Sequence, residues 1–203
     1  HISTNGRALA TRLEKLLDNW PVPVEELSIV AHSMGGLVSR SAIHYANQQW
    51  LRWPDSLKNM IFLGTPHHGA PLEKAGNGID VLLDSTLHTR PFAALGRVRS
   101  AGNTDLRYGH LVDEDWHGQH RYKWRPDRRE TVPLPEGVAC HTVAGAVSSS
   151  NKQLANRLVG DGLVPVKSAL GLHNDPRKTL LFSPSAQWVA HEVNHFGLLD
   201  SPR

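Results

Sequence analysis

Short, continuously apolar runs alternate along this chain with segments whose apolar residues recur at helical spacing. The spacing predicts one helix over 3–20 and a second over 34–49. The side chains of Ser3, Thr4 and Asn5 can cap the start of the first helix. Continuous apolar runs predict buried strands over 27–30 and 60–63. Buried strands that alternate with helices are typical of a parallel sheet covered on both faces, so the predicted fold class is α/β.

The second half of the chain interrupts this alternation and then resumes it. Residues 67–137 are largely polar and form a long insertion between two predicted core strands. Further strands are predicted over 138–147 and 178–182, followed by a loop and by a terminal helix that starts near Phe196. No internal repeat is visible, so residues 1–203 are predicted to form one domain that carries an insertion.

The composition of the chain excludes several classes of partner and structure. The 203 residues are 39% hydrophobic and 20% charged, which suits a soluble globular domain. The net charge is only +3 and the basic residues form no long stripe, so nucleic acid is not an expected partner. No apolar run approaches the roughly 20 residues of a membrane-spanning helix. The lone Cys140 excludes an intrachain disulfide and is compatible with a reducing compartment, which favours a cytoplasmic location.

The segment Ala31-His32-Ser33-Met34-Gly35 contains the pattern that indicates a catalytic residue. It follows the strand over 27–30 and opens the helix over 34–49, so Ser33 lies at a turn from strand to helix. A serine hydroxyl is a poor nucleophile at neutral pH and needs such an exposed turn, a neighbouring base and backbone N–H donors. The alternative is that Ser33 only caps the helix.

This pattern is G-x-S-x-G with Ala31 in place of the first glycine, and it resembles the nucleophile elbow of the α/β-hydrolase superfamily of lipases and esterases. An alanine fits there if the backbone needs no positive φ. The resemblance implies a mostly parallel sheet flanked by helices. It also implies that the chain is the C-terminal portion of the domain, whose first strands would precede His1. The insertion over 67–137 corresponds to a lid or cap, or else to a surface excursion with no gating role.

The superfamily's chain order of serine, acid and histidine selects the other two catalytic residues. Asp161 lies between two glycines, and the segment from Gly160 to Ala169 resembles the acid loop of esterases and lipases, in which a short helix follows a Val-Pro pair. The segment from Asn194 to Leu199 resembles the loop that carries the base, which selects His195. The sequence also offers other candidates: the acids Asp175 and Asp200, and the bases His173 and His191.

Three further histidines are expected at the substrate pocket. His32 adjoins the nucleophile, and His67 and His68 lie in Thr65-Pro66-His67-His68-Gly69 after the strand over 60–63. That segment resembles the one after the sixth core strand in lipases and GPI-inositol-deacylase-like hydrolases. Joint metal binding by His67 and His68 is not expected, because neighbouring side chains of an extended segment point apart.

A zinc site is a competing hypothesis for the last histidines. The segment from His191 to His195 satisfies H-E-x-x-H, which on a helix places two zinc ligands on one face and Glu192 as general base. Only three positions of this pattern are fixed. After His195 the chain offers one acidic residue, Asp200, as a third ligand. A serine mechanism without metal or cofactor is therefore preferred.

These residues predict a serine hydrolase that cleaves carboxylic esters, with a small-molecule or lipid ester as substrate. Ser33 attacks, His195 moves the proton, Asp161 orients His195, and the N–H of Met34 binds the oxyanion. The second oxyanion donor would come from a loop upstream of His1, so the segment alone is expected to be poorly active. The oligomeric state is not indicated. A binding module with a hydrolase fold and no catalysis is the alternative from another class.

Overall fold

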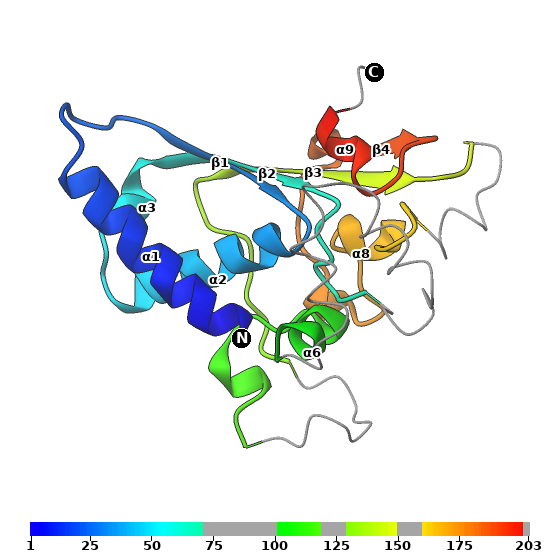
Figure 1. The fold of residues 1–203 in the computed structure, drawn as a ribbon, viewed down its shortest axis with the longest axis horizontal. Helices are drawn as coiled ribbons and strands as arrows, with labels where there is room; N and C mark the ends of the chain where they lie inside the picture. Colours follow the sequence, from blue (N-terminus) through cyan, green and yellow to red (C-terminus); the bar gives the residue numbers. More distant parts are fainter. Residues whose placement is uncertain (71–100, 119–128, 150–159, 201–203) are drawn as a thin grey trace.

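The computed structural model describes residues 1–70, 101–118, 129–149 and 160–200. In this part of the chain, four parallel strands form one sheet in the order β1-β2-β3-β4. They span Leu27–His32 (β1), Leu57–Leu63 (β2), Ala139–Ala146 (β3) and Gln187–His191 (β4). Helices α1 and α2 lie side by side on one face of the sheet (Figure 1). The predicted α/β class is confirmed.

The helices agree with the predicted segments for the most part. Their bounds are Ile2–Asp18 (α1), Met34–Gln48 (α2), Trp53–Ser56 (α3), Ala101–Tyr108 (α6), Val166–Ala169 (α8) and Gly197–Asp200 (α9), with 3-10 turns at Asp113–Asp115, Pro176–Lys178 and Pro184–Ala186. The predicted helices over 3–20 and 34–49 are α1 and α2. No helix in the described ranges is long and apolar enough to cross a membrane.

The start of α1 differs from the prediction. The helix begins at Ile2, so Ser3 and the two residues after it lie inside its first turn and do not cap it. The capping acceptor comes from a distant segment: the carboxylate of Asp105 accepts the Ile2 N–H at 2.8 Å. The Ser3 hydroxyl is buried and accepts a hydrogen bond from the Trp116 indole at 3.0 Å. Residues of the insertion thus hold the helix start, which a local pattern cannot reveal.

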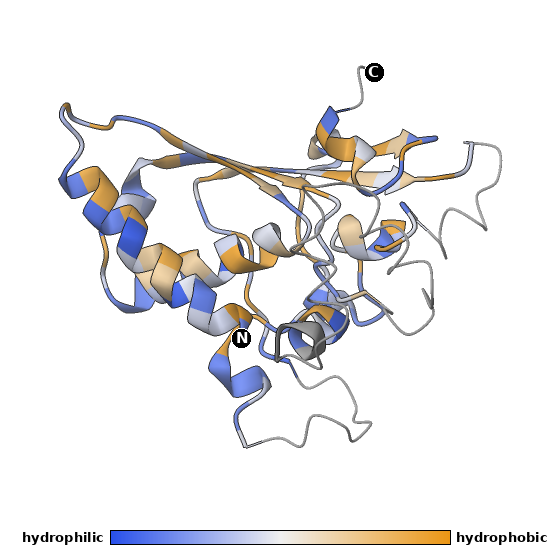
Figure 2. Cartoon of the chain, viewed as in Figure 1, coloured by the Kyte–Doolittle hydropathy of each residue, from blue (hydrophilic) through white to orange (hydrophobic). Residues whose placement is uncertain are grey.

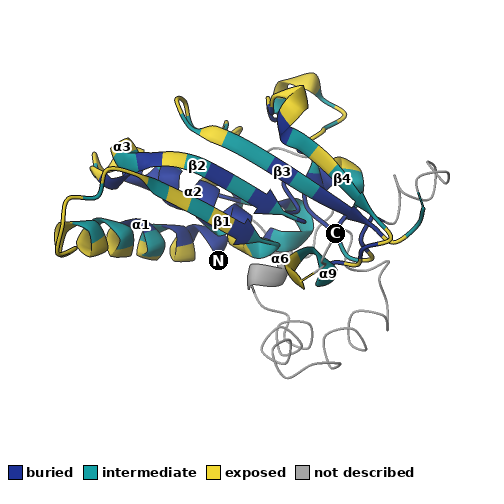
Figure 3. Cartoon of the chain, turned by 90° about the horizontal axis from the view of Figure 1, so that it is seen from above, coloured by how far each residue is buried: buried dark blue, intermediate teal, exposed yellow. Residues whose placement is uncertain are grey.

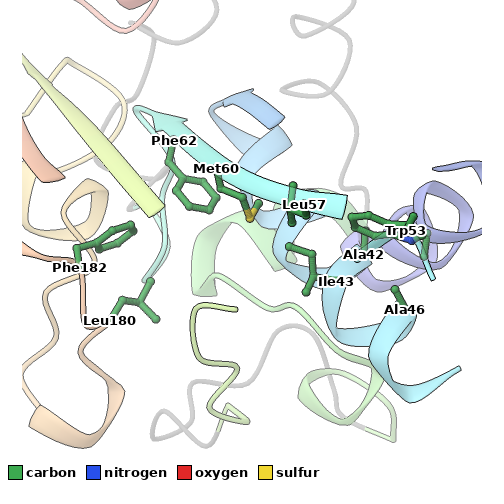
Figure 4. Close-up of a cluster of buried hydrophobic side chains, with 10 residues drawn as sticks. Ala42, Ile43, Ala46, Trp53, Leu57, Met60, Phe62, Leu180 and Phe182 are labelled. Carbon is green, nitrogen blue, oxygen red and sulfur yellow. The ribbon is translucent and has the colours of Figure 1, made fainter. Parts of the chain in front are cut away.

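The main core fills the space between the sheet and the helices. Met60 and Phe62 of β2 meet Ile43 of α2 on one side and Leu180 and Phe182 on the other (Figure 4). Figure 2 shows hydrophobic residues along the strands and mixed residues along α1. Figure 3 shows exposed residues recurring along α1, whereas α2 is largely buried. Helix α2 is therefore the central helix of the layer, and the elbow lies at its first residue.

The last strand is β4 and not the predicted strand over 178–182. The apolar run Leu180-Leu181-Phe182 forms no strand: the Leu180 N–H donates to the Gly171 carbonyl at 2.9 Å, and the Phe182 N–H donates to the Leu180 carbonyl at 3.0 Å. Leu180 and Phe182 bury their side chains in the core, while Leu181 is 88% exposed. The ladder partner of β3 is instead Gln187–His191, where Val143 pairs with Trp188 and Ala146 with His191. Because β4 is an edge strand with partly exposed side chains, it lacks the continuous apolar run of a buried strand.

The parallel order brings four chain segments to one edge of the sheet. Ser33 follows β1, Gly64 follows β2, Asp161 comes after β3, and His195 comes after β4. Since the carboxyl ends of parallel strands meet at the same edge, these four positions are neighbours although they are far apart in sequence.

Two adjacent glycines of α2 have different roles in packing the helix on the sheet. A Cβ on Gly36 would lie 2.2 Å from the Thr65 hydroxyl and 2.9 Å from the Phe62 ring, whereas a Cβ on Gly35 would meet only the Ala31 methyl at 4.0 Å. Gly36 therefore allows the close approach of helix and strand, and Gly35 has room for a side chain.

This contrast gives a matched pair of variants. Gly36→Ala is expected to lower the free energy of unfolding by about 2–3 kcal/mol, because the extra methyl overpacks a buried contact. Gly35→Ala is expected to be neutral or to stabilise by up to about 1 kcal/mol, since alanine favours a helix interior over glycine. Urea unfolding followed by circular dichroism measures both. Equal destabilisation by the two changes would contradict the assigned packing.

Candidate active site

Ser33 occupies the strand-to-helix turn in a strained conformation. It has φ 55° and ψ −128°, a positive φ that non-glycine residues adopt uncommonly. Its N–H donates to the Leu63 carbonyl at 2.9 Å, which ties the turn to the end of β2. The side chain makes no capping hydrogen bond to α2. The capping alternative is therefore wrong, and the Ser33 hydroxyl is left available.

Ala31 fits the first position of the motif without strain. It is a buried residue of β1, and its φ is not positive. The strand backbone thus needs no glycine here. A Cβ added to Gly35 would lie 4.0 Å from the Ala31 methyl, which is an ordinary contact distance. An alanine at this position is therefore compatible with the turn that holds Ser33.

Asp161 and His195 form a buried hydrogen-bonded pair. The distance from His195 Nδ1 to Asp161 Oδ2 is 2.7 Å, and the side chains are 2% and 0% exposed. The other carboxylate oxygen, Oδ1, accepts the N–H groups of Leu163 at 3.0 Å and Val164 at 2.8 Å. The His195 N–H also donates to the Asp161 carbonyl at 3.1 Å. Because the carboxylate holds the Nδ1 proton, the neutral ring has a lone pair on Nε2 and can act as a base.

Gly64 brings this pair next to the serine. It follows Leu63, whose carbonyl binds the Ser33 N–H, and it has φ +55°. A Cβ on Gly64 would lie 3.1 Å from Asp161 Oδ2 and 3.2 Å from His195 Cε1. The Ser33 hydroxyl and the His195 ring make no hydrogen bond in this structure. Such catalytic bonds are often long before substrate binds.

His32 contacts the loop that carries His195. Its Nε2 donates to the His195 carbonyl at 2.9 Å, and the two ring centroids are 4.6 Å apart. Burial, followed by the charge of His195, lowers the pKa of His32, so the ring stays neutral and keeps this donor. No local pattern in the sequence predicts this contact. It fixes the loop that carries His195, in addition to the substrate contact predicted for His32.

Substitutions at His32 test whether this residue positions His195 or binds the substrate. His32→Ala is expected to lower kcat by about 10- to 100-fold with little change in KM, because a loosened base loop misplaces His195. His32→Gln, which can still donate to the carbonyl, is expected to recover part of that loss. Steady-state kinetics on a soluble ester measures both constants. A raised KM with an unchanged kcat would assign His32 to substrate binding alone.

The first turn of α2 supplies the predicted oxyanion donor. Met34 is the first residue of the helix, and the N–H groups of a first helical turn have no intrahelical acceptor. The positive end of the helix macrodipole also favours negative charge there. Met34 directly follows Ser33, as the motif requires, and the role of its N–H as an oxyanion donor stays a prediction.

Comparison with known proteins identifies the family. The PGAP1-like alpha/beta domain matches residues 8–127, more than half of the chain. The chain belongs to this family. No curated protein matches the sequence significantly.

Solved structures agree on the fold of this PGAP1-like domain. It is similar to the mature form of the Bacillus licheniformis lipase BlEst2, with a TM-score of 0.51 and 21% identity over 98% of this chain and 69% of that chain. The propeptide form of that lipase gives a TM-score of 0.55 and 19% identity, and the match covers 100% of this chain and 39% of that one. The predicted α/β-hydrolase fold is confirmed.

The zinc-binding hypothesis fails on local geometry. His191 is the last residue of β4, Glu192 has φ 60°, and the chain then turns to reach His195. The two histidines therefore do not share a helix face, and His195 Nδ1 is bound to Asp161. Within the described ranges of the PGAP1-like domain, no three ligating side chains are grouped for a metal ion.

The other acid candidates lie on the surface. Asp175 is a capping residue whose carboxylate accepts the Arg177 N–H and pairs with the Arg177 guanidinium at 2.8 Å. These hydrogen bonds lower the pKa of Asp175 to about 2. Asp200 is exposed in α9. Of the predicted acids, Asp161 is the one that contacts His195.

The paired histidines after β2 contact different neighbours. The His67 ring is buried, lies 4.8 Å from the Phe62 ring and accepts from Arg40 at 3.4 Å. His68 donates through Nε2 to the Gly171 carbonyl at 2.9 Å. None of these contacts joins the Ser33, Asp161 and His195 group. A role of either histidine in substrate binding stays a prediction.

These two histidines make stability depend on pH. Burial lowers the pKa of His68 to about 4 and holds that of His67 well below its ordinary value of 6.5. Below pH 6.5 the unfolded chain gains protons that the folded protein excludes, so stability falls between pH 6.5 and 4, by on the order of 3 kcal/mol for His68 alone. Urea midpoints across this interval are expected to fall less steeply in His68→Gln. A slope in His68→Gln equal to that of the unmodified protein would contradict the assignment.

The insertion predicted over 67–137 is described only in part, because residues 71–100 and 119–128 lie outside the described ranges. Its described portion includes the Asp105 that caps α1. The Ala70 N–H also donates to the Leu106 carbonyl at 3.0 Å, which holds α6 against the segment after β2. The predicted lid role of the insertion remains untested.

Cys140 has a structural role in the core. It lies in β3, packs against the main core, and has a pKa raised to about 11 by burial. A thiol with this pKa carries little thiolate at neutral pH and is a poor nucleophile.

Proposed function

We propose that this PGAP1-like domain is a serine hydrolase that cleaves carboxylic esters. The observation that supports it most is the buried 2.7 Å hydrogen bond between His195 Nδ1 and Asp161 Oδ2, beside Gly64 at the sheet edge where the strained Ser33 lies. In this pair the imidazole has its second nitrogen free to take a proton from the serine. The similarity to a bacterial lipase supports the same class of reaction.

The proposed reaction has two halves. Ser33 Oγ attacks the ester carbonyl as its proton moves to His195 Nε2, and the Met34 N–H stabilises the oxyanion of the tetrahedral intermediate. The intermediate collapses when His195 returns the proton to the leaving alcohol, which leaves an acyl group on Ser33. Water then attacks the acyl group, with His195 again as base, and releases a carboxylic acid and free Ser33.

We further propose that the acyl groups are apolar or lipid-like. The solved structures that the domain resembles are those of a lipase, and the predicted insertion could shape access to such a substrate. The expected substrates are small-molecule or lipid esters, with no cofactor required. The alternative is a binding module that has the hydrolase fold and no catalysis.

A fluorophosphonate probe tests the proposal, because it reacts only with an activated serine. After labelling and tryptic digestion, the modification is expected on the peptide 16–40 at Ser33. Ser28 and Ser39 of the same peptide serve as internal controls and are expected to stay unmodified. No modification, or equal modification of the three serines, would favour the binding module.

A further inference from the structure

A second group of basic side chains surrounds a small cavity away from the Ser33, Asp161 and His195 group. The cavity has a volume of about 30 Å³, and its lining includes Arg40, His67, His68, Arg129 and Lys178. Such a volume accommodates about two water molecules or one small ion. The lining comes from α2, from the segment after β2, from the segments 109–111 and 129–132, and from the segment 178–180.

Arg40 is a buried cation that has no carboxylate partner among the described residues. Arg40 is 4% exposed. Its Nη2 donates to the Val132 carbonyl, and its Nη1 donates to His67 Nδ1. Its Nε–H has no acceptor, and no carboxylate in the described ranges pairs with the guanidinium. Burial, then the charge of Arg129, lowers the pKa of Arg40 to about 9, which still leaves it charged at pH 7. An uncompensated buried charge is strongly unfavourable.

His67 adds a second donor without an acceptor. A guanidinium offers only donors, so His67 Nδ1 must accept the hydrogen bond from Arg40 and the proton of the neutral ring lies on Nε2. That Nε2 is buried and has no partner, and the residue is 1% exposed. Two side chains that line the same cavity thus have a buried N–H group with no acceptor, and the lining carries additional positive charge.

We propose that this cavity binds one small inorganic anion of about the size of chloride, which accepts hydrogen bonds from Arg40 Nε and His67 Nε2. A water molecule could accept both bonds, but it would not compensate the Arg40 charge. Glu130 is the one acidic side chain in the lining, against three side chains that are cationic at neutral pH. The bound anion would join α2, the segment after β2 and the segment from Arg129 to Val132.

Bromide and chloride are the probes for this site. In crystals grown in sodium bromide, an anomalous difference peak is expected in the cavity next to Arg40 and His67. In solution, Tm is expected to be higher in sodium chloride than in sodium gluconate of equal ionic strength, because gluconate is too large to enter. Above half-saturation, each tenfold increase in chloride is expected to raise Tm by about 3–5 °C.

Matched variants test whether the effect belongs to this cavity. Arg40→Gln is expected to abolish the difference between chloride and gluconate, and Arg177→Gln, at an exposed arginine, is expected to retain it. If Arg40→Gln does not fold, the two measurements on the unmodified protein still decide. Equal Tm values in chloride and gluconate, or only water in the cavity of bromide-grown crystals, would overturn the proposal.

Discussion

Alanine in place of Ser33 is expected to lower kcat for ester hydrolysis by about a millionfold. The change removes the hydroxyl oxygen that forms the proposed acyl bond, and in the described ranges no hydrogen bond brings another serine hydroxyl to the Asp161 and His195 pair. Losses of this size are typical when the nucleophile of a triad is removed. The rate is measured with a p-nitrophenyl ester under saturating conditions.

The matched control is Ser28→Ala, because Ser28 is exposed on the same strand and contacts only surface residues. It is expected to keep full activity. If Ser33→Ala retains activity within tenfold of the unmodified protein, Ser33 is not the nucleophile and the proposed mechanism is wrong.

Asn in place of Asp161 is expected to lower kcat by about 10⁴-fold while the fold is retained. One side-chain oxygen must still accept the N–H groups of Leu163 and Val164, which orients the amide of the new side chain. Its NH₂ group would then face His195 Nδ1, which must act as acceptor. The ring proton would move to Nε2, and His195 could no longer take a proton from Ser33.

The pH profile distinguishes this effect from simple loss of structure. At high pH, hydroxide can replace the missing base, so part of the Asp161→Asn activity is expected to return as pH rises from 7 to 10. Circular dichroism is expected to match that of the unmodified protein. An activity loss below tenfold would indicate that another acid orients His195.

The sequence was most informative where a local pattern determines the structure. The apolar run before Ser33 and the small residues after it specify a strand, a turn and a helix, and β1 and α2 lie where predicted. The acid loop was also predictable because Gly160 and Gly162 adopt positive φ around Asp161.

Other features depend on contacts between distant residues. The Asp105 cap of α1 joins residues 103 positions apart, and the contact from His32 to the His195 carbonyl spans 163. Strand β4 was missed because Gln187–His191 is a half-exposed edge strand, whereas the apolar Leu180 and Phe182 fill the core without pairing. Only the folded arrangement reveals these interactions.

The position of β4 at the sheet margin has a consequence for how the protein loses activity. Among the strands that the structure describes, β4 pairs with β3 alone, and the loop that bears His195 follows it directly. Detachment of β4 would remove the proton acceptor while β1, β2 and β3 remain paired. Mild heating would then inactivate the protein before its central strands exchange their amide hydrogens with solvent.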